Sequence, residues 1–364
     1  MRLADVRPPA PSRGGRPDGP ARPGTRPPPL PHHPLPGRLS AAVRRPADEP
    51  HAGLRWPPAT TSQSPVSRLQ WPAHSAGRRK PVLALLLTPE AAIIATAGGE
   101  VVRYTIGPRR PYLHPLRLPG GPPLTADAPA DHPHHHGLWV GHHRVDSGHR
   151  CDGFYLERPE DGRIVHLDYS EVVASGPVVG FGAHHRWEAP DGYAPLADYW
   201  DLRCGLYPNG DLWLDFRLTL WATASEVCLR STNEAALPLI RVAEAIDGRH
   251  GGVLTSSRGG RGERFTFGRR AEWCDYAGPA LGDRWAGLAI FDHPANPAFP
   301  SPWFTRDYGP FGPHSNYFDG DLWLTPYRPL VRRYRIVIHQ GPAETADLPA
   351  RWRAYAYGDA LSGR

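Results

Sequence analysis

Four histidines and one aspartate occupy six consecutive positions in "DHPHHH", residues 131–136. An imidazole titrates near neutral pH and can donate or accept a proton, so this density suits acid/base catalysis. We therefore predict Asp131, His132, His134 and His135 as catalytic residues. The alternative is a structural role, in which the rings pack on Trp139 and bond to loop amides.

The same stretch offers ligands for a metal. In an extended chain alternate residues point the same way, so His132 and His134 would share a face and form half of a metal site. In cupin barrels a glutamate follows such a pair, whereas this chain has Leu138 and Trp139 there. A divalent metal is therefore a candidate cofactor, with His132 and His134 as candidate ligands. A third ligand would come from a distant histidine: His142, His143, His149, His166, His184, His185 or His339.

A second polar cluster lies far downstream in "FDHPANPAFPSPWFTRDYGPFGPHSN", residues 291–316. Long proline-rich loops that carry such residues usually serve a site, so we expect this loop to meet the histidine stretch. The planar guanidinium of Arg306 suits a carboxylate or hydroxyls, and Trp303 or Tyr308 could stack on a sugar face. The predicted substrate-binding residues of this loop are Asp292, His293, Asn296, Trp303, Arg306 and Tyr308.

The elements that must position these residues are predominantly strands. In "DLWLDFRLTLW", residues 211–221, apolar side chains take every second position, which predicts a half-buried strand. The segments 195–207, 225–232, 237–246, 285–291 and 334–339 have similar patterns, and 82–87 and 91–97 predict a further pair of strands. The Asn-Gly of "YPNGD", 207–211, predicts a hairpin, and only 344–358 has a partly helical pattern.

Many strands without a repeat period favour one large antiparallel β-sandwich over a propeller. Our first choice is an extended sandwich of the sugar-mutarotase kind, and a jelly roll is the second. Residues 1–78 are rich in proline and arginine and lack apolar periodicity, which predicts disorder. The expected organisation is a tail over 1–78, a single sandwich domain over 79–358 and a short tail over 359–364.

Charge and composition exclude some classes of partner. Residues 1–80 hold 14 of the 42 basic and 4 of the 36 acidic residues, which leaves 28 basic and 32 acidic residues in the body. A mildly acidic body gives no reason to expect nucleic acid. No segment has the roughly 20 apolar residues of a membrane helix, so we expect a cytoplasmic protein. The 4 cysteines form no CxxC pair and predict buried free thiols.

Both polar clusters, with "RRPYLHPL" (109–116), "GRIVHL" (162–167), "AEWCDYAG" (271–278) and "YRIVIHQG" (334–341), carry a resemblance over about residues 82–345. The chain resembles an uncharacterised bacterial family commonly labelled methane oxygenase PmoA. Its members tend to accompany glycosidases and sugar oxidoreductases, which implies a carbohydrate or keto-sugar substrate. The resemblance also implies substrate contacts at Tyr112 and His114. His136 stands where the family commonly has arginine.

We therefore expect an enzyme that binds a small carbohydrate and acts on it by histidine-based acid/base chemistry, as a hydrolase, lyase or epimerase. Glu244 and Asp275 are candidate second carboxylates. One alternative is a non-catalytic carbohydrate-binding sandwich, since the 12 tryptophans and 14 tyrosines supply stacking platforms. The other is a metal-dependent oxidoreductase, as the family label suggests.

Overall fold

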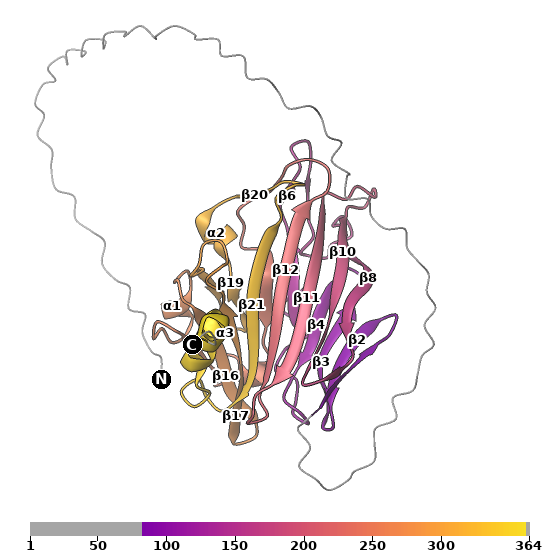
Figure 1. The fold of residues 1–364 in the computed structure, drawn as a ribbon. Coiled ribbons are helices and arrows are strands. Elements are labelled where there is room, and N and C mark those ends of the chain that lie inside the picture. Colours follow the sequence, from indigo (N-terminus) through magenta and orange to yellow (C-terminus); the bar gives the residue numbers. More distant parts are fainter. Residues whose placement is uncertain (1–81, 362–364) are drawn as a thin grey trace, which may run out of the picture. The chain divides into compact units, whose positions relative to one another are not determined.

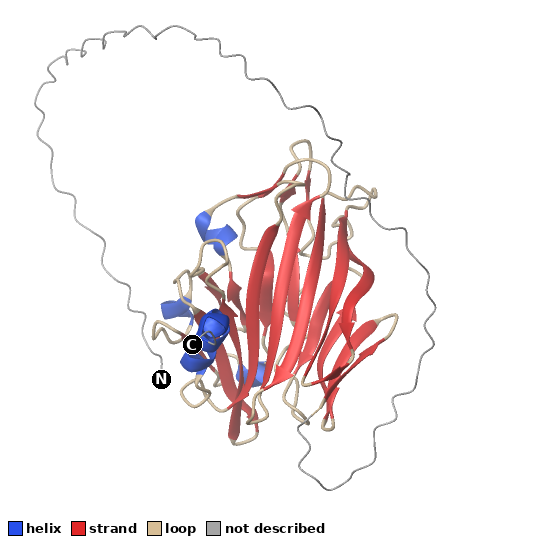
Figure 2. Ribbon diagram, in the orientation of Figure 1, coloured by secondary structure: helices blue, strands red, loops and turns tan. Residues whose placement is uncertain are grey.

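The computed structural model describes residues 82–361, which fall within one compact unit. The tail predicted over 1–78 and residues 362–364 lie outside the described residues. The fold is all-β and antiparallel, with two large sheets and one small one (Figures 1 and 2). Each large sheet alone has at least the roughly eight strands of a whole jelly roll, so the large sandwich predicted first is the fold found.

The first large sheet has nine strands. In spatial order they are β18 (Trp303–Thr305), β19 (Pro310–Pro313), β14 (Ala235–Arg241), β5 (Leu138–His142), β4 (Pro111–Leu116), β3 (Gly99–Ile106), β2 (Ala91–Thr96), β1 (Leu83–Leu87) and β9 (Ser175–Gly176). The pair β1 and β2 confirms the two strands predicted over 82–87 and 91–97.

The second large sheet has eight strands, and its long central strands form the front layer in Figure 1. In order they are β15 (Val253–Ser256), β16 (Trp273–Leu281), β17 (Arg284–Asp292), β21 (Leu330–Gln340), β12 (Leu212–Ala222), β11 (Leu196–Leu206), β10 (Val178–Glu188) and β8 (Arg163–Val173). A turn at Tyr207–Asp211 joins β11 to β12, and Gly210 adopts a φ of 90° there, which confirms the predicted hairpin.

The core lies between these two sheets because each strand alternates its side chains. Along β12, Leu212, Leu214, Phe216, Leu218 and Leu220 are fully buried, while the residues between them point to the outer face. The nine-stranded sheet contributes Leu138 and Val140 from β5 to the same core. Hence each sheet has a second, outer face on which polar chemistry can be placed.

Short elements complete the fold. The small sheet contains β20 (Leu322–Leu324), β13 (Val227–Leu229), β6 (Val145–Asp146) and β7 (Cys151–Asp152). The helical segments are η1 (Glu244–Ile246), α1 (Glu263–Thr266), α2 (Ser315–Asp319) and α3 (Leu348–Leu361). The segment predicted over 237–246 is therefore a strand followed by a short 3-10 helix, and α3 extends to Leu361, beyond the start of the tail predicted over 359–364.

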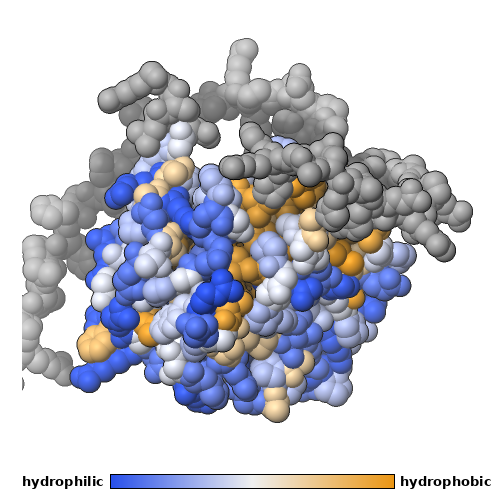
Figure 3. Space-filling model, turned by 90° about the horizontal axis from the view of Figure 1, so that it is seen from below, coloured by the Kyte–Doolittle hydropathy of each residue, from blue (hydrophilic) through white to orange (hydrophobic). Residues whose placement is uncertain are grey.

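The surface and the cysteines agree only partly with the sequence analysis. No helix among the described residues is long and apolar enough to span a membrane. Hydrophilic residues cover most of the end of the sandwich seen in Figure 3, and apolar residues surface in a band near its middle. All four cysteines are free, and Cys204, Cys228 and Cys274 are buried as predicted. Cys151 is exposed instead, because it lies in the two-residue strand β7 of the small sheet.

Candidate functional site

The histidine stretch forms two consecutive turns between β4 and β5, rather than the extended chain considered above. The amide of His132 donates to the carbonyl of Pro129, and the amide of His135 donates to that of His132, each at 3.0 Å. Gly137 closes the loop with a φ of 51°, where a Cβ would lie 2.0 Å from the carbonyl oxygen of Leu113. Only glycine fits this approach, so the loop is held tightly against β4.

Because the chain turns, four rings stack in one column over the outer face of the nine-stranded sheet. The ring of His132 lies between Tyr308 and His135, with centroid distances of 5.0 and 4.7 Å and interplanar angles of 13°. His135 in turn stacks on Trp139 at 4.9 Å. Trp139 belongs to a small apolar cluster with Tyr155, Ala236, Leu239 and Phe304, which supports the column from below. The column brings His132 and His135 together with Tyr308, a residue of the downstream loop.

Arg241, at the end of β14, fixes the first residue of the stretch. Its Nη2 donates to both carboxylate oxygens of Asp131 at 3.0 and 2.9 Å. The guanidinium also lies 5.0 Å from the ring centroid of Tyr308, in cation–π contact. Burial alone would raise the pKa of Asp131, but the hydrogen bonds from Arg241 and His132 outweigh it, so this pKa is lowered. Asp131 is therefore an ionised, positioned hydrogen-bond acceptor.

His134 is the freest imidazole of the stretch. It touches His132, His135 and Tyr155 only through ring contacts, and its nitrogens have no hydrogen-bond partner among residues 82–361. Burial, together with the charge of Arg110, lowers the pKa of His134 to about 4. His134 is neutral at pH 7, with a lone pair available to a ligand. His135 is more deeply buried, and burial lowers its pKa to about 2.

His136, which the sequence analysis did not select, has the opposite environment. Its Nδ1 donates to Asp127 at 2.5 Å and its Nε2 donates to Glu157 at 3.2 Å. Ionised carboxylates only accept, so both ring nitrogens carry protons and the ring is a cation. Burial alone would lower the pKa of His136, but these two hydrogen bonds raise it. Arg110 completes the network by donating from Nε to Glu157 at 2.8 Å.

The two residues implied by the family resemblance lie beside His136. The ring of Tyr112 stacks on His136 at 4.7 Å, and its hydroxyl donates to Asp127 at 3.3 Å. Burial and the charge of Asp127 raise the pKa of Tyr112 to about 12, so it keeps its proton. His114 bonds through Nδ1 to the hydroxyl of Thr125 at 2.9 Å.

Most of the downstream loop does not join this site. Asp292 is buried at the end of β17 in the other sheet, where it accepts hydrogen bonds from Asn296 and the amide of Ser301. Trp303 is fully buried in the core and donates to the carbonyl of Ala271. Arg306 pairs with Glu263 at 2.9 Å and lies 4.1 Å from the ring centroid of Phe267.

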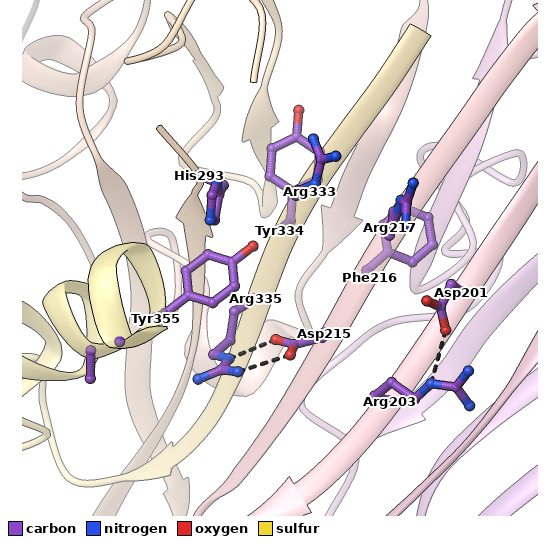
Figure 4. A pocket seen from close by; sticks show the side chains of 12 residues that line it. Asp201, Arg203, Asp215, Phe216, Arg217, His293, Arg333, Tyr334, Arg335 and Tyr355 are labelled. Carbon is purple, nitrogen blue, oxygen red and sulfur yellow. Dashed lines mark hydrogen bonds and ion pairs between the residues drawn. The ribbon is translucent and has the colours of Figure 1, made fainter. Parts of the chain in front are cut away.

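His293 lies on the opposite side of the molecule from the histidine stretch. It lines a cleft of about 370 Å³ on the outer face of the eight-stranded sheet (Figure 4). Its neighbours there include Arg333, Arg335 and Tyr355. The expectation that the two Asp-His-Pro stretches meet is therefore wrong, because they follow strands of different sheets. Of the six predicted residues of the downstream loop, Tyr308 is the one that stacks in the column of rings, and Phe304 of the same loop packs in the apolar cluster beneath it.

The distant histidines do not supply a third metal ligand. Each has a partner of its own: His142 with Asn316, His143 with Glu234, His149 with Tyr193, His166 and His185 with Tyr104, His184 with Asp168, and His339 with Asp275. In residues 82–361 no three His, Cys, Asp or Glu side chains are placed to hold one ion together. The two candidate ligands His132 and His134 face each other edge to face at 5.7 Å between centroids.

The candidate second carboxylates are also separate from the site. Glu244 is exposed on η1. Asp275 is fully buried on β16, where Nε2 of His339 lies 2.8 Å from its Oδ1. Burial raises the pKa of Asp275, and the adjacent carboxylate raises the pKa of His339 against the effect of its own burial. The carboxylates that do join the imidazoles are Asp127, Asp131 and Glu157.

A family model described as a family of unknown function, DUF6807, matches residues 92–353. This range covers the histidine stretch and all of its partners named above. A comparison with curated proteins found no match.

Proposed function

Since the chain belongs to the family of unknown function DUF6807, we propose its chemistry from the site itself: an enzyme that transfers a proton on a sugar or keto-sugar. One observation carries this proposal. His134 is a neutral imidazole without a hydrogen-bond partner among the described residues, and it lies two positions from the imidazolium His136. Local environments that shift the pKa values of two neighbouring groups in opposite directions are typical of acid/base sites.

His134 is the proposed base. Its free ring can approach a C–H next to a carbonyl, or a hydroxyl, and take the proton onto nitrogen. Return of that proton to another position or face of the substrate gives isomerisation or epimerisation, and loss of a neighbouring leaving group gives elimination. His136 is a positioning residue, because both its nitrogens are bonded to carboxylates and its fixed charge lies beside the reacting groups.

The charge balance of the site favours a neutral polyhydroxylated ligand. The site contains two hydrogen-bonded groups of charges, Arg110 with Glu157, His136 and Asp127, and Arg241 with Asp131. Together they hold three cations and three carboxylates. The side chains of Asp127 and Asp131 are 32% and 41% exposed, so their oxygens can accept hydrogen bonds from sugar hydroxyls. The charges of these six side chains therefore cancel, and the one further cation on the ring column, Arg249, lies over the ring of Tyr308, 5.1 Å from its centroid.

The test is turnover of a panel of sugars and keto-sugars by the wild type, His134→Gln and His184→Gln. We expect His134→Gln to lose roughly 100-fold or more in kcat/KM, the usual size of a general-base contribution. His184→Gln is the matched control, because this imidazole pairs with Asp168 on the exposed face of β10, away from the site. Equal turnover by the wild type and His134→Gln would overturn the proposal.

The pH profile adds a second readout. Since the pKa of His134 is about 4, the base is available above that pH and the rate should fall as the pH drops through about 4. The pKa of His136 is raised, so the alkaline limb should lie above the ordinary histidine value of about 6.5. Binding without turnover would support a carbohydrate-binding sandwich, and turnover only with an added divalent metal would support the oxidoreductase alternative. A cytoplasmic location remains part of the proposal.

A further inference from the structure

A second polar site lies on the outer face of the eight-stranded sheet, in the cleft that contains His293. Strands β11, β12 and β21 form its floor, and α3 forms one wall (Figure 4). Its charged side chains are Asp201, Arg203, Asp215, Arg217, Arg333 and Arg335. Four arginines therefore face two aspartates, a formal excess of two positive charges.

Two of these arginines are neutralised within the sheet. Arg335 donates from Nε and Nη2 to the two carboxylate oxygens of Asp215, at 2.6 and 2.8 Å. The Nε of Arg203 lies 3.0 Å from Oδ1 of Asp201, and its Nη2 donates to Glu171 at the same distance. These pairs account for both aspartates of the cleft.

Arg217 and Arg333 have no such partner. Neither side chain has a hydrogen bond or ion pair among residues 82–361, and no dashed line reaches either one in Figure 4. The strand register places them directly opposite each other on β12 and β21. Like charges in that position repel and destabilise a sheet. On its other side Arg217 faces Asp201 of β11, but that carboxylate is already paired with Arg203, so the excess of positive charge remains.

We propose that this cleft binds the anionic group of a small ligand, a carboxylate or a phosphate, between Arg217 and Arg333. The ligand supplies the negative charge that the sheet lacks at this position, and the two guanidinium groups offer it several charge-assisted hydrogen bonds. His293 and the ring of Tyr355, 5.2 Å apart between centroids, border the same space. Burial and the charge of Arg333 lower the pKa of His293, which makes it a neutral hydrogen-bonding group there.

The size of the cleft limits the ligand. A volume of about 370 Å³ is at the lower end for small-molecule sites, which suits a single sugar-sized molecule with one acidic group. This site is on the opposite sheet from the imidazole site and does not depend on the proposed proton transfer. If the cleft did not bind an anion, the proposal of proton transfer at the imidazole site would still stand.

The experiment measures ligand binding to the full chain by calorimetry and by the shift in Tm. The probes are inorganic phosphate, glucuronate as a sugar that carries a carboxylate, and glucose as its neutral counterpart. The proteins are the wild type, Arg217→Gln, Arg333→Gln and the double variant. The matched control is Arg186→Gln, which removes an exposed arginine of the same sheet that lies near Glu188 instead.

We expect at least one anion to bind the wild type and raise its Tm, while glucose does not. Each single variant should weaken binding roughly 10-fold, and the double variant should abolish it, with Arg186→Gln unchanged. A preference for phosphate or for glucuronate identifies which acidic group the arginines select. No binding of either anion at millimolar concentration, or equal binding by the double variant, would overturn the proposal. Tm values without ligand show whether each variant is folded.

Discussion

The two outer faces of the sandwich differ in whether their arginines are paired with carboxylates. On the nine-stranded sheet, Arg110 and Arg241 each bond to a carboxylate, and aromatic rings cover much of the remaining surface. On the eight-stranded sheet, Arg217 and Arg333 oppose each other across two strands, and neither guanidinium forms a hydrogen bond or ion pair among the described residues, although Asp201 lies opposite Arg217 on the next strand. The first arrangement positions neutral and charged imidazoles, whereas the second leaves charge for a ligand to neutralise. Whether the arginines of a face are paired with carboxylates inside the protein thus indicates whether that face suits a neutral or an anionic ligand.

The largest expected effect compares one substitution on both faces. Arg110→Met removes a side chain that is 2% exposed and leaves Glu157 with only the longer hydrogen bond from His136, so the free energy of unfolding should fall by about 3 kcal/mol. Arg217→Met removes an exposed charge that lies between Arg333 and Asp201 in the register, so repulsion and attraction offset each other and stability should change by no more than about 0.5 kcal/mol. Denaturant unfolding measures both. Equal losses would contradict the contrast between the two faces.

Acid should destabilise the imidazole face. The pKa of His135 is about 2 in the folded protein and near 6.5 when unfolded, so only the unfolded chain takes up a proton between these values. The contribution of the neutral His135 ring to stability is fully present above the unfolded pKa of about 6.5, and it is lost as the pH falls below that value. Between pH 6.5 and 5 this one ring should cost about 2 kcal/mol.

The variant His135→Phe keeps a flat ring on Trp139 but cannot titrate. Its free energy of unfolding should therefore fall less steeply than that of the wild type over the same pH range. Chemical denaturation at several pH values measures the difference. Parallel curves for the two proteins would show that His135 is not held neutral by burial.

The smallest effect concerns the ring of Tyr308, which covers Arg241 on the imidazole face. Tyr308→Leu removes the stack on His132 and the cation–π contact with Arg241, which should lower stability by about 1 kcal/mol. Tyr327→Leu is the control, because Tyr327 is 94% exposed. Thermal unfolding compares the two. An equal shift in Tm would mean that the ring column contributes nothing to stability.

The fold was predictable because it depends on local patterns. The alternation of apolar and polar residues predicted β12, and the Asn-Gly turn predicted the hairpin that leads into it. Both signals extend over only a few residues, so they can be read from the local sequence. The helix predicted from residue 344 begins later, at Leu348, because a turn that starts at Pro342 precedes it. Pro349 then lies in the first turn of α3, where a proline is tolerated.

The site was predictable only where its contacts are local. The density of histidines located the ring column, whereas Arg110, Glu157 and Arg241 come from distant segments whose convergence depends on strand order. One signal was present for Arg241: it is a charged residue that ends the otherwise apolar and wholly buried strand β14. Such a residue must have a partner inside the protein, and that partner is Asp131.

The exposed thiol of Cys151 has a practical use. Because the other three cysteines are at most 1% exposed, a maleimide dye should react with the native protein at one position without any mutation. Burial raises the pKa of Cys151, so this labelling should speed up in mildly alkaline buffer. The labelling rates of the three buried thiols would then report local unfolding, since each thiol reacts only when the sheet around it opens. The natural positions of the cysteines thus provide one site for attaching a dye and three probes of how often the sheets of the sandwich open.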